Sequence, residues 1–337
     1  MIIVLRQGAS KADAEPILAE IRAQGLEPLY LPGEEKIVIG ALGDERVLAS
    51  LHLESVGCVE KVIPILKPYK LANREFKPQR SLVTVGDVTF GGSRIPLIAG
   101  PCSVESAEQL LTVARAVQRS GASLLRGGAF KPRTSPYAFQ GLEAEGLKLL
   151  EQARRETGLP IVTEVLSEHD VDTVAAISDM LQIGARNMQN YRLLKAVGGT
   201  QVPVLIKRGP AASMSELLMA AEYVMSEGNS QVVLCERGIK SFFADTRNTL
   251  DLAMVPLLKR ETHLPVIVDP SHGTGVRDII PDMALAAVAA GADGLMIEVH
   301  PDPAHALSDG FQQLTPAAFD QLVPRIQRVA AAVDRTV

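Results

Sequence analysis

The sequence predicts an α/β protein in which a closed (β/α)8 barrel of the TIM type follows a small ferredoxin-like α+β domain. Three observations support this prediction. Hydrophobic residues make up 47% of the chain but aromatic residues only 4%, and Trp is absent, a composition typical of parallel sheets covered by helices. Eight short apolar runs alternate with helix-like segments, and a separate pattern of strands and helices precedes them.

Residues 1–66 predict the ferredoxin-like domain, because strands and helices follow one another in the order βαββαβ. One helix begins behind Ser10, which forms a capping box with Asp13, and the other begins behind Asp44. This arrangement is a common frame for domains that sense small molecules, so we expect a regulatory module, an oligomerisation element, or both. The strands are expected at Met1–Arg6, Glu27–Leu31, Lys36–Gly40 and Val59–Leu66.

Two further segments separate this domain from the barrel strands. Residues 67–80 are charged and bracketed by Pro68 and Pro78, which is typical of a linker. The catalytic domain is then expected to span residues 81–337. It opens with the alternating segment Leu82–Phe90, which predicts a β-hairpin that could cover one end of the barrel.

The barrel prediction depends on the spacing of the apolar runs. Eight βα units in roughly 240 residues is the size of a (β/α)8 barrel. An open doubly wound sheet is the alternative, but no GxGxxG motif opens the first helix of the series. The strands are expected at Ile95–Gly100, Ser123–Leu125, Ile161–Val165, Met180–Ile183, Val202–Ile206, Gln231–Leu234, Val266–Val268 and Gly294–Val299.

Charge and cysteine content limit the classes of partner. The formal net charge is −5, so there is no overall positive field to attract nucleic acid or an anionic membrane. No segment offers about 18 uninterrupted apolar residues, and no leader-like segment opens the sequence. Cys58, Cys102 and Cys235 show no disulfide-like spacing, which is typical of a reducing compartment. We therefore expect a cytoplasmic protein that binds neither nucleic acid nor membrane.

Reactive side chains follow the predicted strands, and in a barrel the C-terminal strand ends form one rim that carries the chemistry. Any one of them could be an ordinary solvated or hydrogen-bonded loop residue. The full set is harder to explain in that way. It comprises Cys102, Arg126, Lys131, Glu164, Arg186, Lys207, Glu236, Arg237, Asp269, His272 and Glu298.

One subset offers metal ligands. Cys102, His272, Glu298 and Asp309 supply sulfur, nitrogen and oxygen donors, a mixture that suits a divalent transition metal. Alone, Cys102 could be a small buried hydrophobic residue and Glu298 the partner of an ion pair. Together the four residues favour a metal site.

A second subset offers binding groups for anions. Five cations gather on the rim of a protein whose net charge is negative, and Arg and Lys together suit a ligand that carries phosphate and carboxylate groups. They could instead pair with Glu164, Glu236 and Asp269. A turn with a guanidinium and two hydroxyls, Arg133, Thr134 and Ser135, suits a second phosphate. The five cations are Arg126, Lys131, Arg186, Lys207 and Arg237.

These motifs, in this order, resemble the 3-deoxy-D-arabino-heptulosonate 7-phosphate (DAHP) synthase family, whose members catalyse the first step of the shikimate pathway to chorismate and the aromatic amino acids. The resemblance covers the whole barrel and is far more specific than a shared fold. The first 66 residues resemble the ferredoxin-like domain that precedes the barrel in some members. The matching stretches are Ala99–Ser106, Leu125–Pro136, Gln182–Asn187, Leu205–Arg208, Leu234–Gly238, Val268–His272, Ile297–Pro301 and Leu307–Gly310.

The resemblance implies a site and a reaction. One divalent ion (Mn, Fe, Co, Zn or Cu) would be bound by Cys102, His272, Glu298 and Asp309. Phosphoenolpyruvate would be held by the five rim cations, and erythrose 4-phosphate by Arg133, Thr134 and Ser135. Lys131, Glu164 and His300 are candidates for proton transfer. The related 3-deoxy-D-manno-octulosonate 8-phosphate (KDO8P) synthases share the metal motifs, but they have a different loop at the position of Lys131–Ser135, which favours the four-carbon sugar here.

The resemblance also implies a homotetramer and feedback inhibition by an aromatic amino acid, tyrosine or phenylalanine, at the N-terminal domain. Two other functions are compatible with the residues. A Schiff-base aldolase would use Lys207 as its nucleophile, and borohydride trapping would detect it. A sensor built on an inactive barrel would lack a ligand or a cation, whereas all of them are present.

Overall fold

The computed structural model describes residues 1–33, 35–42, 47–63, 67–133 and 135–337, and the chain forms two compact units, Met1–Pro68 and Tyr69–Val337. In the first unit a four-stranded antiparallel sheet has the order β2-β3-β1-β4, which is the ferredoxin-like arrangement expected from the sequence. Its elements are β1 (Ile2–Leu5), α1 (Lys11–Ala23), β2 (Glu27–Pro32), β3 (Ile37–Leu42) and β4 (Val59–Ile63).

Local sequence explains this small sheet. Ile3 and Leu5 alternate inward along β1 and pack in one cluster with residues of α1. The helix begins after Ser10, whose side chain accepts from the Asp13 amide while the Asp13 carboxylate accepts from the Ser10 amide at 2.7 Å. The helix expected behind Asp44 is not found in the described residues between β3 and β4. Asp44 lies outside the described residues, and two short 3-10 turns follow instead, η1 (Leu48–Leu51) and η2 (Leu53–Ser55).

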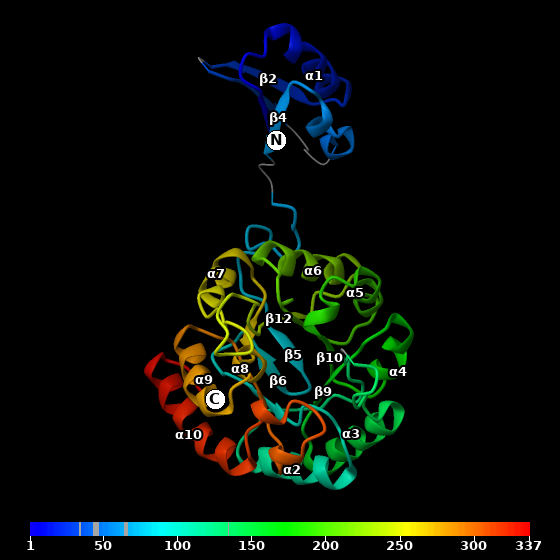
Figure 1. The fold of residues 1–337 in the computed structure, drawn as a ribbon, viewed down its shortest axis with the longest axis vertical. Helices are drawn as coiled ribbons and strands as arrows, with labels where there is room; N and C mark the ends of the chain where they lie inside the picture. The colour runs from blue at the N-terminus through cyan, green and yellow to red at the C-terminus, as the bar shows by residue number, and fades with distance from the viewer. Residues whose placement is uncertain (34, 43–46, 64–66, 134) are drawn as a thin grey trace. The chain divides into compact units, whose positions relative to one another are not determined.

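The second unit is the predicted closed barrel (Figure 1), in which β14 pairs with β7 to complete the ring. Every residue of its strands is buried, because side chains that face outward meet helices and those that face inward fill the interior. The strand bounds agree with the expected ones to within two residues. They are β7 (Leu97–Gly100), β8 (Leu124–Arg126), β9 (Ile161–Glu164), β10 (Met180–Ile183), β11 (Val204–Lys207), β12 (Val232–Glu236), β13 (Val266–Val268) and β14 (Leu295–Glu298).

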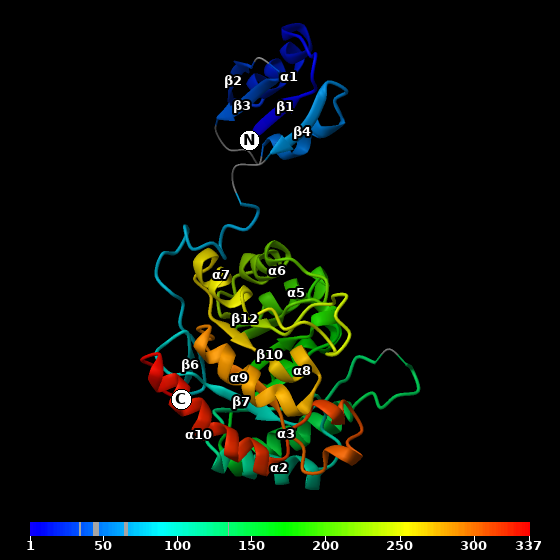
Figure 2. The ribbon, with the colours of Figure 1, turned by 60° about the vertical axis from the view of Figure 1, so that its left-hand side comes forward.

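Helices surround the barrel, and α9 and α10 pack side by side on its outside (Figures 1 and 2). None of the helices in the described part of the chain combines the length and apolar character needed to cross a bilayer. The helix bounds are α2 (Ala107–Arg119), α3 (Glu143–Thr157), α4 (Val171–Ala175), α5 (Tyr191–Gly198), α6 (Met214–Ser226), α7 (Met254–Glu261), α8 (Pro270–Thr274), α9 (Ile280–Ala289) and α10 (Pro316–Ala332).

A hairpin of β5 (Val83–Val85) and β6 (Val88–Phe90) closes the N-terminal end of the barrel. Phe90 is fully buried and belongs to the same apolar cluster as the inward-facing barrel residues Ile98 and Met296. Gly294, just before β14, leaves room for this ring, since a Cβ there would lie 3.1 Å from a Phe90 ring carbon. The open end of the barrel is therefore the opposite, C-terminal one.

The segment expected to be a linker, residues 67–80, is for the most part attached to the barrel. The Glu222 carboxylate on α6 accepts from the backbone amides of Leu71 and Ala72, both at 2.9 Å. His263 accepts from Ser81 at 2.8 Å through Nδ1 and donates to the Leu71 carbonyl at 2.7 Å through Nε2. The barrel unit accordingly begins at Tyr69 rather than at residue 81.

Candidate active site

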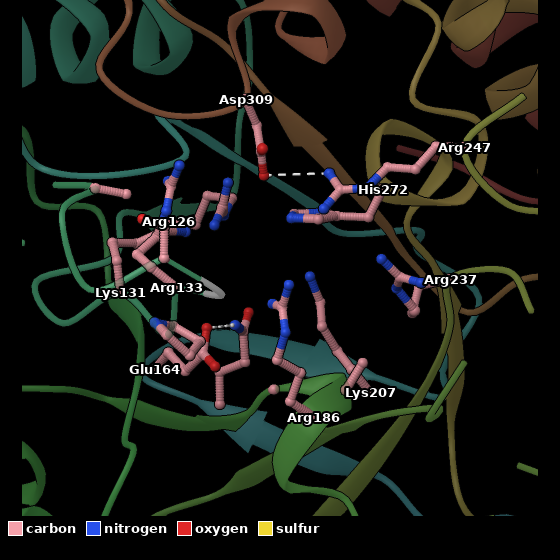
Figure 3. Close-up of a pocket in the computed structure, with 16 residues that line it drawn as sticks. Arg126, Lys131, Arg133, Glu164, Arg186, Lys207, Arg237, Arg247, His272 and Asp309 are labelled. Atoms are coloured by element: carbon pink, nitrogen blue, oxygen red, sulfur yellow. Dashed lines mark hydrogen bonds and ion pairs between the residues drawn. The ribbon is translucent and has the colours of Figure 1, made fainter. Parts of the chain in front are cut away.

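A cavity of about 330 Å³ lies among the C-terminal ends of the barrel strands (Figure 3). Its position follows from the fold, because residues at the C-terminal ends of the strands, such as Arg126, Glu164 and Lys207, face the mouth of the barrel. The residues that line it are Arg126, Lys131, Pro132, Arg133, Ser135, Ala138, Glu164, Gln182, Gly184, Ala185, Arg186, Lys207, Arg237, Arg247, His272 and Asp309.

Cationic side chains dominate this lining. Figure 3 shows Arg186, Lys207 and Arg237 converging on the cavity from neighbouring strands. Two of the seven lining cations are paired with buried carboxylates, Arg126 with Glu298 and Lys207 with Asp269. Among the described residues, Arg133, Arg186 and Arg237 have no carboxylate within ion-pair distance. The cavity therefore has unpaired positive charge available for an anionic ligand.

The expected pairing of these cations with strand-end acids is only partly present. Lys207 does pair with Asp269, but Glu236 pairs with the buried Arg208 at 2.9 Å. Glu164 lines the cavity and accepts from the Gln182 side-chain amide at 3.2 Å. Burial lowers the pKa of Arg237, the direction expected for a desolvated cation, and Asp269 offsets this only in part.

A cluster of metal-type donors lies beside the cations. The donor atoms of Cys102, His272 and Glu298 all lie within 4.8 Å of one another. Cys102 and Glu298 are fully buried, and Asp309 Oδ2 lies 3.7 Å from Cys102 Sγ. The four residues come from four separate segments: the loop after β7, helix α8, the end of β14 and the turn before Gly310. The barrel thus brings together all four predicted metal ligands.

Hydrogen bonds orient the donors. The Asp269 carboxylate accepts from His272 Nδ1 at 2.7 Å, so the proton of the neutral ring is on Nδ1. Nε2, which lies 3.4 Å from Glu298 Oε1, then has its lone pair free. A histidine whose second nitrogen donates to a carboxylate is the usual arrangement at metal sites. The donor set and its orientation fit one divalent transition metal.

The protonation states of the cluster agree with this. Burial lowers the pKa of His272, which keeps its ring neutral. Burial opposes ionisation of Glu298, but His272, Arg126 and Lys131 outweigh it and bring the pKa of that carboxyl to about 2. Burial, reinforced by Glu298, raises the pKa of the Cys102 thiol to about 12 despite the nearby Lys131 and Arg126, so this residue would become a thiolate on binding a metal ion. Lys131 Nζ lies 3.2 Å from this sulfur.

One predicted site residue does not line the cavity, and another cannot be placed in it because it is not among the described residues. His300 is outside its lining: Nε2 lies 3.2 Å from Glu105, and Nδ1 accepts from the Asp302 amide at 3.0 Å. Both ring nitrogens are engaged by residues outside the cavity lining, so the geometry gives His300 no support as a proton-transfer group, and its role stays a prediction. Thr134 lies outside the described residues. Its neighbours Arg133 and Ser135 do line the cavity.

One cation that lines the cavity, Arg247, was not predicted from the sequence. Its Nη1 lies 3.2 Å from Asp309 Oδ2 and 2.7 Å from the Gln312 side-chain oxygen. Gln312, which donates to Glu298, was also not predicted from the sequence. Asp269, which orients His272, was predicted on the rim, but only as a possible partner of the cations. Asp269 was visible as a strand-end carboxylate three residues before His272. Arg247 gave no such signal, because it lies deep in the loop that follows β12.

Fold and site together define a class: a barrel enzyme whose cationic cavity suits a multiply anionic substrate and lies beside a donor cluster that fits a divalent metal. Comparisons with known proteins make this more specific. The DAHP synthetase I family matches residues 52–335, and the DAHP synthase ferredoxin-like domain matches residues 1–67. The chain belongs to the DAHP synthetase I family. Members are metal-dependent enzymes that condense phosphoenolpyruvate with erythrose 4-phosphate, release phosphate and so begin the shikimate pathway, and this is the activity of the chain.

Individual relatives agree with this family. A phospho-2-dehydro-3-deoxyheptonate aldolase of Thermotoga maritima is 46% identical over 99% of this chain and 98% of the relative. A crystal structure of a phospho-2-dehydro-3-deoxyheptonate aldolase (DAHP synthase) from Thermotoga maritima superposes with a TM-score of 0.97 at 45% identity, and the match covers 100% of this chain and 98% of the other. A 2-dehydro-3-deoxyphosphooctonate aldolase of Syntrophotalea carbinolica is 37% identical over 73% of this chain and 94% of the relative.

Proposed function

We propose that the condensation takes place in the cavity described above, with one divalent ion held by Cys102, His272, Glu298 and Asp309. The observation that carries this proposal is the proximity of two sets of residues in one cavity. Three donor atoms lie within 4.8 Å of one another, and unpaired guanidinium groups line the space beside them. When bound, the ion supplies Lewis acidity that polarises the aldehyde of erythrose 4-phosphate. The donor set accepts Mn, Fe, Co, Zn or Cu.

Phosphoenolpyruvate is assigned to the five cations named from the sequence. Lys207, Arg186 and Arg237 converge on one part of the cavity and can bind its phosphate and carboxylate groups. Arg126 and Lys131 lie next to the metal donors, Lys131 with its ammonium 3.0 Å from the Cys102 carbonyl oxygen. These contacts would hold the enol carbon facing the metal-side donors and thereby supply orientation and charge neutralisation.

The phosphate of erythrose 4-phosphate is assigned to the loop that carries Arg133, Thr134 and Ser135. Arg133 and Ser135 line the outer part of the cavity, and Ser135 is exposed. A guanidinium with neighbouring hydroxyl donors suits a terminal phosphate. The aldehyde at the other end of this substrate would then reach inward to the metal donors.

The bond changes follow from the two substrates. C3 of phosphoenolpyruvate adds to the aldehyde carbon, positive charge develops at C2, and water adds there. The resulting hemiketal phosphate expels inorganic phosphate with cleavage of its C–O bond. Lys131 and Glu164 remain the candidates for proton transfer, because both line the cavity and both are at least nine-tenths buried. Lys131 can protonate the oxygen that forms at the former aldehyde carbon.

The test is phosphate release from phosphoenolpyruvate with erythrose 4-phosphate or with arabinose 5-phosphate, before and after chelation and metal add-back. We expect turnover with erythrose 4-phosphate that is lost on chelation and restored by metal, and that is lost in Cys102→Ser. Faster turnover with arabinose 5-phosphate would instead assign the chain the substrate of KDO8P synthase. Full activity of Cys102→Ser without added metal would refute the metal assignment.

For the N-terminal domain we propose a regulatory role with an aromatic amino acid as effector, supported by its match to the DAHP synthase ferredoxin-like domain. Inhibition by tyrosine or phenylalanine that disappears when residues 1–68 are removed is the expected result. The homotetramer and the cytoplasmic location expected from the sequence stay predictions, and light scattering of the purified protein tests the first of them.

A further inference from the structure

Arg247 lies in the cavity although it belongs to no barrel strand. Its side chain, 27% exposed, comes from the loop between β12 and α7, and the cavity brings it opposite Asp309 (Figure 3). The guanidinium contacts two acceptors with the same nitrogen: Nη1 is 3.2 Å from Asp309 Oδ2 and 2.7 Å from Gln312 Oε1. One side chain therefore joins the β12–α7 loop to the segment that follows β14.

Both acceptors lead to proposed metal donors. Asp309 Oδ2, the atom that Arg247 contacts, lies 3.7 Å from Cys102 Sγ. Gln312 is fully buried, and its side-chain amide donates to Glu298 Oε2 at 2.6 Å. Because the Gln312 oxygen accepts from Arg247, the amide nitrogen must face Glu298. A single cation thus orients two of the four donors, one directly and one through an amide.

Arg247 is itself held in place by the protein. Its backbone amide donates to the Thr274 carbonyl at 2.7 Å, and its guanidinium lies 5.8 Å from the centre of the Phe311 ring. Its aliphatic stem packs on Gly275, which has φ +65° and where a Cβ would come within 2.4 Å of the Arg247 Cβ. Gly275 lies three residues after His272, so the segment that carries this donor also fixes Arg247.

The backbone at Asp309 requires such support. Asp309 has φ +46°, in the left-handed region that is costly for a residue other than glycine and persists only where neighbouring groups hold it. On one side, Ser103 bonds to Ser308 at 2.6 Å, and Glu105 accepts from the Leu307 amide at 3.0 Å. Arg247 supplies the contact to the Asp309 carboxylate itself.

We propose that Arg247 is a positioning residue for the divalent ion: it orients the carboxylates of Asp309 and, through Gln312, of Glu298, and so increases the affinity for the metal without ligating it. This inference rests on the proposed metal role of Cys102 and its partners. It also connects the two halves of the site, because the loop that carries Arg247 begins with Arg237, which is assigned to phosphoenolpyruvate.

The experiment measures binding of Mn²⁺ alone to the metal-free full-length protein by isothermal titration calorimetry. Arg247→Met keeps the stem on Gly275 and removes the charge, whereas Arg247→Lys keeps the charge and loses the planar fork. We expect the Mn²⁺ dissociation constant to rise about 10- to 100-fold in Arg247→Met, the usual effect of losing an outer partner of a ligand, and less in Arg247→Lys. Arg115→Met, which removes a surface pair with Glu156, is the matched control.

Two further measurements separate the outcomes. Cys102→Ser is titrated with Mn²⁺ in parallel. If both Arg247→Met and Cys102→Ser bind Mn²⁺ like the wild type, the proposed metal site is wrong. If Cys102→Ser loses Mn²⁺ affinity but Arg247→Met does not, only the inference on Arg247 is overturned. Unchanged Mn²⁺ affinity with a higher KM for either substrate would make Arg247 a substrate contact and overturn the proposal. The absorption spectrum of the Co²⁺-loaded protein should change in Arg247→Met, since it reports ligand geometry. Arg247→Lys preserves the test if Arg247→Met does not fold.

Discussion

Replacing Asp269 with Asn should weaken both the stability of the barrel and its affinity for metal. Asp269 is fully buried, and three donors surround its carboxylate: Lys207 Nζ and His272 Nδ1 at Oδ2, and the His272 backbone amide at Oδ1. Asn has the same shape but only one acceptor oxygen, so at least one donor would face its NH2 group. Lys207, itself buried, would also lose its only paired carboxylate among the described residues.

The expected magnitudes follow from these contacts. Removing one partner of a buried ion pair costs about 3–5 kcal/mol, which in a domain of this size lowers Tm by roughly 6–10 °C. The loss of the His272 orientation should weaken metal binding about 10- to 100-fold, or about 1.4–2.8 kcal/mol. Lys207 and His272 hold the pKa of Asp269 well below its usual range against the effect of burial. The stability from this pair is therefore present at neutral pH and is lost as pH falls through the low folded-state pKa.

Differential scanning calorimetry of the metal-free protein measures the change in Tm, and calorimetric titration with Mn²⁺ measures the change in metal affinity. Asp282→Asn, at an exposed pair with Arg325, is the matched control and should change Tm by less than about 2 °C. A Tm of Asp269→Asn within 2 °C of the wild type, together with an Mn²⁺ affinity within about threefold, would refute the reasoning, because the carboxylate would then hold neither Lys207 nor His272.

Three further predictions follow from other parts of the barrel. Arg186→Met removes a guanidinium that has no carboxylate partner among the described residues. It should lower kcat/KM for phosphoenolpyruvate by roughly 10- to 150-fold without lowering Tm. Unchanged KM and kcat in steady-state kinetics would contradict this prediction. Phe90→Ala should cost about 3–5 kcal/mol of stability with kcat preserved, since the ring fills the closed end of the barrel; a calorimetric loss below 1 kcal/mol would count against that packing. Burial lowers the pKa of His263 from 6.5, so just below that pH the unfolded chain binds more protons than the folded one. The free energy of unfolding should therefore fall as pH drops below about 6.5. Tm measured from pH 8 to 5 should decline less steeply in His263→Gln than in the wild type.

Much of the barrel could be predicted because its pattern is local. A run such as Val266–Val268 is bounded by polar or turn residues, and a parallel strand covered on both faces is apolar along most of its length. The N-terminal domain shows the limit of local signals. Asp44 is a good helix cap in isolation, yet the described residues between it and β4 form 3-10 turns and no α-helix. A capping residue indicates where a helix can start and leaves its length to tertiary packing.

The site could be predicted for those residues whose position is determined by the end of a barrel strand. Cys102, His272, Glu298 and Asp309 meet because a closed barrel brings the ends of its strands to one rim. His300 shows why position alone is insufficient. It follows β14 by only two residues, and strand alternation would place it on the same face as Glu298, but its Nε2 lies 3.2 Å from Glu105 instead. The contacts of Arg247 depend on the path of a long loop, which no periodicity in the sequence encodes.

The hairpin under the barrel determines how molecules can travel through the enzyme. With Phe90 and its neighbours filling the N-terminal end, the cavity opens at the C-terminal end of the barrel, and the described residues leave no second exit through the packed interior. Both substrates enter, and the sugar acid and phosphate leave, past the same loops. A molecule on Lys207 at the bottom is covered once another occupies Arg133 near the mouth. The deeper binding position must therefore be occupied first and vacated last. We expect sequential, ordered kinetics in which phosphoenolpyruvate binds first.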